Sequence, residues 1–480
     1  MVVAFFLTPY ILHRLGDAGF GLWMLVSSVT GYYGLLGFGT RNAIIRYVSR
    51  YHASNDHESL NRVINTGVAT YTALCLLMIL ASVLVAWKLE LLFPISPEMM
   101  PTARLLVLVL GIGTAVTFPL AIFGGVLEGL QQFTWTGVVQ VFSSLLRAGS
   151  IVWALERGYG LLAIGWITVI VNLAGSIVYV AVTYRLLPTF ELRRSLVDLK
   201  TLWTMASFGL VTFFIGIAQA LRFNLDSIVI GMFLSLQAIS LFAIASRLVL
   251  YASEVVQTMA QVFTPMSSHY DALGDRDRLR RLLITGNRYA SLVMFPMAAV
   301  LLVVGQSAIR VWVGPQYSAS YALLVALTIP MTFYTAQATS TKVLYGMSRH
   351  ILLAKVLLAE GIANLVLSII LVRSYGVMGV ALGTAIPLVV TSVFFLPLHM
   401  CRVLELPLKR YLREAHWHAM LLVIPLCLVL WWADRWIQPE GYPGLIAVLL
   451  AGGVVYGAEI LAYFYLVERP AQMRSVTVAE

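Results

Sequence analysis

Apolar runs of 18 or more residues recur along the whole 480-residue chain, and each is long enough to cross a bilayer as an α-helix. Hydrophobic residues make up 60% of the sequence and charged residues 11%, whereas a soluble domain of this size would be about 25% charged. No stretch has the composition of a soluble domain, a low-complexity tail or a flexible linker. The sequence therefore predicts an all-α polytopic membrane protein, whose function lies within or across the membrane.

We expect about fourteen transmembrane helices. The first is a short apolar segment at residues 1–12. The full spans that follow are predicted at 20–45, 65–87, 104–123, 134–155, 160–184, 203–232, 239–264, 284–304, 318–342, 351–373, 377–400, 417–436 and 443–466. An even number of crossings places both termini on the same side of the membrane.

The distribution of Lys and Arg between alternate loops predicts the orientation. If the N-terminus is cytoplasmic, 22 of the 32 basic residues lie on the cytoplasmic side and 7 on the outer side, and three lie inside spans. Because cytoplasmic loops carry an excess of Lys and Arg, we expect both termini in the cytoplasm. A net charge of +10 could also indicate nucleic-acid binding, but the excess of cytoplasmic Lys and Arg already accounts for it.

One block of sequence occurs twice. Residues 49–67 and 268–286 align without a gap, and eight of the nineteen positions are identical at an offset of 219. Shorter matches continue the repeat. Val126-Leu127-x-Gly129 matches Val343-Leu344-x-Gly346 at an offset of 217, and Tyr159-Gly160 matches Tyr375-Gly376 at an offset of 216. A repeat of this length has the size of half a membrane transporter. Each half holds six spans, which predicts two lobes related by a pseudo-two-fold axis along the membrane normal. The block itself is expected to set the angle between spans rather than to contact a substrate.

The repeat divides the chain into an N-terminal six-helix lobe at 1–190, a cytoplasmic linker at 191–202, a second six-helix lobe at 203–402, and 403–480 with two additional helices and a cytoplasmic tail. At the offset of 219, Met1 falls opposite Ala220, so the first lobe lacks a counterpart of residues 203–219. Twelve helical residues cover only about 18 Å of an approximately 30 Å hydrocarbon core. We therefore expect the first helix to be truncated; the alternative is a short re-entrant start.

Several motifs resemble those of polysaccharide transporters. The run Leu15-Gly16-Asp17-x-x-Phe20-Gly21-x-Trp23 is similar to their L-G-x-x-x-[YF]-G-x-W signature. Further similar motifs are Gly37-Phe38-Gly39, Arg46-Tyr47-Val48, Asp226-x-x-x-Ile230-Gly231 and Val343-Leu344-x-Gly346. The resemblance covers residues 1–466 and is to the oligosaccharide flippases, including O-antigen flippases, of the multidrug/oligosaccharidyl-lipid/polysaccharide exporter superfamily.

The resemblance implies two six-helix lobes around a central cavity. It also implies that the protein moves an undecaprenyl-diphosphate-linked oligosaccharide from the inner to the outer leaflet of the bacterial cytoplasmic (inner) membrane, for surface polysaccharide synthesis. We expect alternating access, in which the two lobes rock against each other. The expected partners are the lipid-linked glycan, membrane lipids and a coupling proton or cation, and the protein is expected to be a monomer.

Charged residues inside spans are the candidate site residues, because a charge at the centre of a bilayer costs at least about 2.5–3.5 kcal/mol on insertion scales. Arg147, Arg222 and Arg247 are such residues. Arg is permanently charged and can hold phosphate oxygens bidentately, so we expect some of these three to hold the lipid diphosphate. Each could instead be the structural partner of a nearby carboxylate. Arg46 and Arg41 are further candidates for the diphosphate, or residues that snorkel to the interface.

Asp226 and Glu254 are the candidate carboxylates in the second half, and each could bind a coupling proton or cation. We favour charge balance against Arg222 and Arg247, since Arg222 and Asp226 are spaced i,i+4 and could pair on one helix. Glu459 lies outside the repeat and is expected to pack peripherally.

Two other function classes are alternatives to the flippase. A proton- or cation-coupled multidrug exporter of the same superfamily usually needs a buried acid in the N-terminal half, whereas the acids of this half fall at span ends or in loops. A membrane glycosyltransferase, polymerase or ligase usually carries a larger extramembrane loop than the approximately 20-residue loops predicted here. The chain has no P-loop lysine motif, and His416 and His418 lack a third metal ligand. We therefore expect a transporter that is not an enzyme, without cofactor or metal.

Overall fold

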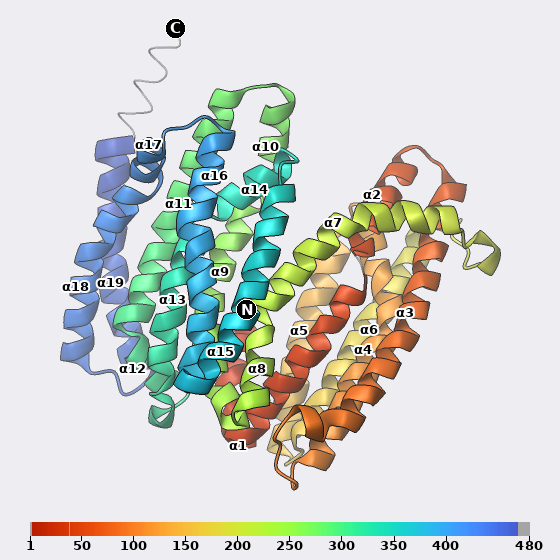
Figure 1. Cartoon of the computed structure of the whole chain (residues 1–480), viewed down its shortest axis with the longest axis horizontal. Helices are drawn as coiled ribbons and strands as arrows, with labels where there is room; N and C mark the ends of the chain where they lie inside the picture. Colours follow the sequence, from red (N-terminus) through yellow and green to blue (C-terminus); the bar gives the residue numbers. More distant parts are fainter. Residues whose placement is uncertain (1, 38, 469–480) are drawn as a thin grey trace. The chain divides into compact units, whose positions relative to one another are not determined.

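The computed structural model describes residues 2–37 and 39–468, and the regular secondary structure of these residues is helical (Figure 1). Phe38 of the Gly37-Phe38-Gly39 motif and the predicted tail beyond residue 468 lie outside the described residues. The helices form two compact units. The first comprises the chain up to Ser240 together with Leu357–Leu365, and the second comprises Leu241–Val356 and the chain from Val366 onward.

The first unit is built mainly from the helices that precede Ser240. These are α1 (Val2–Gly31), η1 (Tyr32–Gly37), α2 (Thr40–Ala53), α3 (His57–Leu92), α4 (Met100–Gly129), α5 (Phe133–Glu156), α6 (Leu161–Leu186), η2 (Arg194–Leu196), α7 (Leu199–Phe223) and α8 (Leu225–Phe233). One buried core cluster joins α2, α3 and α4 through residues that include Ile44, Ile64 and Ile122.

The second unit contains most of the remaining helices. These are α9 (Leu236–Ala260), α10 (Phe263–Ala272), α11 (Arg276–Val303), α12 (Gly305–Trp312), η3 (Pro315–Tyr317), α13 (Ser320–Ala336), α14 (Ala338–Gly346), α15 (Ile351–Val389), η4 (Val390–Phe395), α16 (Leu396–Val403), α17 (Leu408–Leu412), η5 (Arg413–Trp417), α18 (His418–Ile437), α19 (Tyr442–Tyr463) and η6 (Phe464–Glu468). The start of α9 and Leu357–Leu365 of α15 belong to the first unit.

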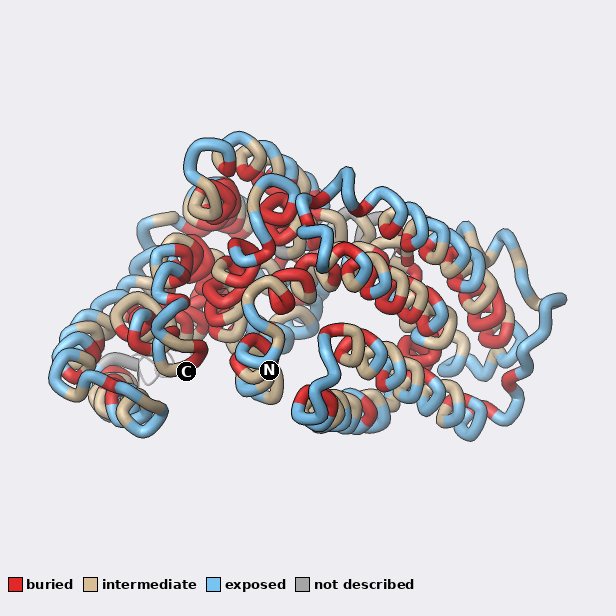
Figure 2. The backbone as a smooth tube through the Cα atoms, turned by 90° about the horizontal axis from the view of Figure 1, so that it is seen from below, coloured by how far each residue is buried: buried red, intermediate tan, exposed pale blue. Residues whose placement is uncertain are grey.

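The protein is a multi-pass membrane protein. Within the described residues, nine helical segments are long and apolar enough to cross a membrane, or ten when the bent pair of α13 and α14 is counted as one span. Figure 2 shows buried and exposed residues alternating along many helices, as expected when one face packs on protein and the other faces lipid. Exposed apolar side chains such as Leu76 of α3 and Leu450 of α19 lie on such outward faces.

The long helix α15 reverses its direction at Gly376. This residue has φ 57° and ψ −136°, a conformation that only glycine adopts readily. The Ser368 hydroxyl donates a hydrogen bond to the carbonyl of Val380 at 3.5 Å, whereas twelve residues of straight helix would separate them by about 18 Å. The predicted spans at 351–373 and 377–400 therefore correspond to two antiparallel segments.

Other predicted spans are interrupted in the structure. Gly16, with φ 69° and ψ 174°, breaks α1 between the predicted segment at 1–12 and the predicted span that begins at 20. That span was expected to continue to residue 45, but α1 ends at Gly31 and is followed by η1 and α2. The clustered glycines of this stretch, among them Gly39 with φ 68°, weaken a continuous helix.

The repeated block has the same local structure in both copies. The Asp56 carboxylate caps α3 by accepting a hydrogen bond from the Ser59 amide at 3.0 Å, and Asp275 caps α11 in the same way from the Arg278 amide at 2.9 Å. At an offset of 217, Gln131 and Ser348 both have positive φ, 60° and 57°. The sequence repeat is therefore also a repeat of helix starts and turns.

We predict that replacing either capping aspartate with Ala lowers the melting temperature of the purified protein, because the first turn of α3 or α11 then loses its side-chain acceptor. Asp56→Asn and Asp275→Asn are the matched controls, since Asn caps nearly as well.

The cap at Asp56 should also depend on pH. The hydrogen bond from the Ser59 amide lowers the pKa of Asp56 below its usual range. The contribution of this cap is therefore present at neutral pH and is lost as the pH falls through that lowered pKa, whereas Asp56→Asn is insensitive. Equal destabilisation by Ala and Asn would contradict a capping role.

Candidate functional site

A buried ion pair joins α7 to α15 within the first unit. The Arg222 Nε donates a hydrogen bond to Glu360 Oε1 at 2.5 Å, and Nη2 contacts the same oxygen. Both side chains are only 4% exposed. Removing either partner would leave an uncompensated charge in a low-dielectric interior. The loss of one partner should therefore strongly lower the free energy of unfolding.

The break between α7 and α8 positions the charged groups. Arg222 lies in the last turn of α7 and Asp226 in the first turn of α8, on either side of Asn224. A cation at a helix C-terminus and an anion at a helix N-terminus are both favoured by the helix dipoles. The sequence analysis treated 203–232 as one span, and the structure divides it at Asn224.

Polar side chains from η1 and α15 complete what we call the α7–α8 polar cluster: Tyr32, Arg222, Asp226, Glu360 and Asn364. The Tyr32 hydroxyl donates to the Ala220 carbonyl at 3.1 Å. The Asn364 amide donates to the Leu221 carbonyl at 3.5 Å. Within the described residues, the buried Glu360 Oε2 has no hydrogen-bond partner. The cluster therefore offers a carboxylate oxygen that could take a proton or a cation.

Glu360 was missed by the sequence analysis. The candidate carboxylates there were Asp226, Glu254 and Glu459, although Glu360 lies inside the predicted span 351–373. The signal that identified the candidate arginines, a charge inside an apolar run, would also have found it.

Arg147 on α5 has different surroundings. Its Nη2 donates a hydrogen bond to Asn172 Oδ1 on α6 at 2.7 Å, and its Nε is buried without a hydrogen-bond partner among the described residues. The partner is a neutral amide, and the described residues give Arg147 no carboxylate. The guanidinium therefore keeps both its charge and unused donors inside a predicted span.

The two candidate arginines on α2 are exposed. Arg41 pairs with Glu128 at the end of α4, with 2.6 Å between Nη2 and Oε1, and its side chain is 55% exposed. Such an exposed pair contributes little to stability. Arg46 is exposed on the same helix, and its guanidinium lies 5.8 Å from the ring centroid of Tyr47.

The last two candidates, Arg247 and Glu254, lie on the part of α9 that belongs to the second unit. Arg247 is half-buried, whereas Glu254 is exposed. Between them, the Ser253 and Thr335 hydroxyls share a hydrogen bond of 2.8 Å that links α9 to α13. The structure thus pairs Arg222 with Glu360, places Asp226 at the start of the next helix, and puts the other candidates in separate surroundings.

We predict that Arg222→Ala and Glu360→Ala each destabilise the protein by about 3–5 kcal/mol, because each leaves a buried charge without its partner. The double variant Arg222→Met/Glu360→Met should lose less than the sum of the single changes to Met. Thermal unfolding of the purified variants, with the monodisperse fraction from size-exclusion chromatography, measures both effects. Additive single and double losses would show that the two side chains do not interact.

Comparisons with known proteins agree on the family. Residues 11–322 match the family model described as polysaccharide biosynthesis protein. EpsK of Bacillus subtilis (strain 168), described as an uncharacterized membrane protein, is 22% identical over 411 residues, which cover 83% of this chain and 79% of EpsK. The probable low-salt glycan biosynthesis flippase Agl15 of Haloferax volcanii is 20% identical over 265 residues, which cover 55% of this chain and 52% of Agl15.

Solved structures agree on the fold. The lipid II flippase MurJ in an inward closed conformation matches with a TM-score of 0.72 and 15% identity, over 97% of this chain and 98% of that chain. An inward-facing MATE family transporter of the MOP superfamily matches with a TM-score of 0.70 and 15% identity, over 85% of this chain and 96% of that chain. With a family model that matches residues 11–322 and a fold shared with these transporters, the chain belongs to the polysaccharide biosynthesis protein family.

Proposed function

We propose that the protein moves an undecaprenyl-diphosphate-linked oligosaccharide from the inner to the outer leaflet of the bacterial cytoplasmic membrane, for surface polysaccharide synthesis. The observation that carries this proposal is the state of Arg147, a permanent cation in a membrane-spanning helix whose partner is the neutral Asn172. The family membership supports polysaccharide synthesis as the setting.

The chemistry of the substrate explains the choice of Arg147. A lipid diphosphate is a doubly charged anion that must leave the headgroup region during translocation. Arg147 can offer guanidinium donors that its hydrogen bond to Asn172 does not use, and Arg can hold phosphate oxygens bidentately. Arg222 already has Glu360 as its ion-pair partner, which favours a structural role. Arg247, Arg41 and Arg46 remain further candidates for contact with the diphosphate.

The proposed topology has fourteen crossings, with two six-helix lobes at 1–190 and 203–402, two additional C-terminal helices and both termini in the cytoplasm. The matching caps at Asp56 and Asp275 support the equivalence of the two lobes. Transport would proceed by alternating access, in which the lobes expose the cationic site first to one leaflet and then to the other. The lipid tail would stay in the bilayer while the diphosphate and the sugars pass.

A second candidate function is a proton- or cation-coupled multidrug exporter. The α7–α8 polar cluster favours it, because Asp226 and Glu360 are buried carboxylates and Glu360 Oε2 has no hydrogen-bond partner among the described residues. The same carboxylates could couple a flippase to a proton or cation, and the positive charge of Arg147 favours the flippase between the two functions.

We predict that Arg147→Ala lowers surface polysaccharide at least tenfold in a null strain that expresses the variant, while lipid-linked glycan accumulates on the inner leaflet. The physical reason is the loss of the charge that compensates the diphosphate, and Arg147→Lys should restore part of the transport. Arg157→Ala is the matched control, because Arg157 is an exposed cation directly after the same helix. Quantification of surface polysaccharide and of leaflet-specific lipid-linked glycan, at equal protein levels, measures the effect.

Two results would contradict these proposals separately. Normal surface polysaccharide with Arg147→Ala would remove Arg147 from the site. Normal surface polysaccharide in the null strain itself would exclude the flippase function, and a concurrent gain in sensitivity to cationic drugs would favour the exporter.

A further inference from the structure

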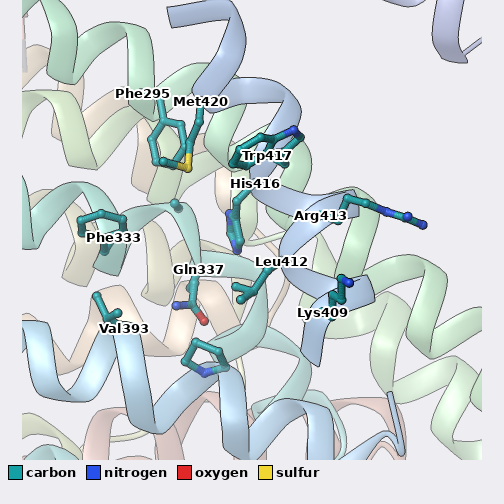
Figure 3. Close-up of a pocket in the computed structure, with 12 residues that line it drawn as sticks. Phe295, Phe333, Gln337, Val393, Lys409, Leu412, Arg413, His416, Trp417 and Met420 are labelled. Carbon is teal, nitrogen blue, oxygen red and sulfur yellow. The ribbon is translucent and has the colours of Figure 1, made fainter. Parts of the chain in front are cut away.

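The second unit contains a cavity of about 450 Å³, and all the residues that line it belong to this unit. Helices α11 and α13, the π-helical segment η4, the start of α16 and the segment from α17 to α18 surround it. Figure 3 shows Phe295, Phe333, Val393 and Met420 on one side of the cavity and the cations Lys409 and Arg413 on the other. The volume lies within the range of about 300–1,000 Å³ that is typical of ligand pockets.

The polar side chains inside the cavity are held by the protein itself. His416 Nδ1 is 2.7 Å from the Ser291 hydroxyl and its Nε2 is 3.3 Å from the Tyr411 hydroxyl. Gln337 donates to the Ser392 carbonyl and accepts from the Tyr411 hydroxyl at 3.4 Å. These groups have partners without any ligand, so the surface that the interior offers to an occupant is mainly apolar.

Two π-helical segments line this cavity. Val393 belongs to η4, and Arg413, His416 and Trp417 belong to η5. Short π-helical segments are rare, and they occur frequently at functional sites because they redirect side chains at a cost in helix geometry. Their meeting at one cavity is the second observation that indicates a binding site.

The cations at the rim are not neutralised by the protein. Arg410 forms an ion pair with Glu414, with 3.0 Å between Nε and Oε1. The Glu414 carboxylate therefore already has a cationic partner. In the part of the chain that the structure describes, Lys409 and Arg413 form no ion pair, and both are exposed. A site with an apolar interior and an unpaired cationic rim matches an amphiphile with an anionic head.

We propose that this cavity binds an anionic phospholipid, with an acyl chain inside the apolar cavity and the phosphate on Lys409 and Arg413. Basic pockets between membrane helices at the cytoplasmic surface are known to take anionic lipid headgroups. The loop between the predicted spans 377–400 and 417–436 is predicted to be cytoplasmic, and its basic residues include Lys409 and Arg413. Such a lipid would fix the start of α18 on the second unit and is distinct from the transported molecule.

The test measures binding of phosphatidylglycerol to the purified full-length protein by native mass spectrometry. Lys409→Gln/Arg413→Gln should weaken this binding about tenfold or more, because two headgroup contacts are lost. The matched control is Arg349→Gln/Arg402→Gln, which removes two exposed charges of the second unit that do not line the cavity and should bind like the wild type. Phosphatidylcholine should bind weakly to all forms, and inorganic phosphate should not displace phosphatidylglycerol, because it lacks the acyl chain.

A second measurement places the acyl chain and does not depend on the charge variants. Phosphatidylglycerol with brominated acyl chains should quench tryptophan fluorescence, and Trp417→Phe should abolish part of that quenching, since Trp417 lines the cavity. Equal lipid binding by the two double variants would overturn the proposal, as would quenching that does not depend on Trp417. Displacement of phosphatidylglycerol by a polyprenyl diphosphate would also overturn it, because the cavity would then belong to the transported lipid.

Discussion

The structure depends on the requirement that every backbone polar group inside a membrane has a hydrogen-bond partner within the protein. Helices meet this requirement internally, which explains why the regular structure of the described residues is helical. Where the helices break, the backbone still finds partners. The Asn224 amide bonds to the Ala220 carbonyl across the α7–α8 break, and the carbonyl of Val380 accepts from Ser368 beside the reversal at Gly376. The irregular segments therefore keep hydrogen bonds to the helices that flank them.

Charged side chains inside the helices meet the same low dielectric in two different ways. Arg222 is neutralised by a carboxylate, and both partners are almost fully buried. Among the described residues, the hydrogen-bond partner of Arg147 is a neutral amide, and the guanidinium keeps its charge. The first solution stabilises a fixed arrangement, whereas the second leaves a positive potential to which an anion can bind. This difference separates a structural arginine from a candidate transport residue better than position within a span does.

Much of the architecture was predictable from local sequence. Apolar runs predicted the membrane-spanning helices, and the repeated block predicted the equivalent helix starts that Asp56 and Asp275 cap. The interruption at Asn224 was not predicted, because an apolar run carries no signal for a short break in a helix, whereas the clustered glycines from Gly31 onward could have indicated where α1 ends. The pairing of Arg222 with Glu360 was also beyond prediction, since 138 residues separate them and only tertiary packing brings them together. The cavity near Trp417 depends on two π-helical segments, for which sequence periodicity gives no rule.

The sequence distance between Arg222 and Glu360 has a consequence for biosynthesis. At about 5–20 residues per second, a ribosome needs roughly 7–30 s to make the 138 residues between them. During this time α7 has been synthesised with a permanent charge, while its carboxylate does not yet exist. Until α15 arrives, the nascent α7 carries this charge without Glu360, at a cost of about 2.5–3.5 kcal/mol if the charge reaches the bilayer centre. Completion of the first unit is therefore a late event, coupled to the synthesis of a helix that lies mostly in the second unit.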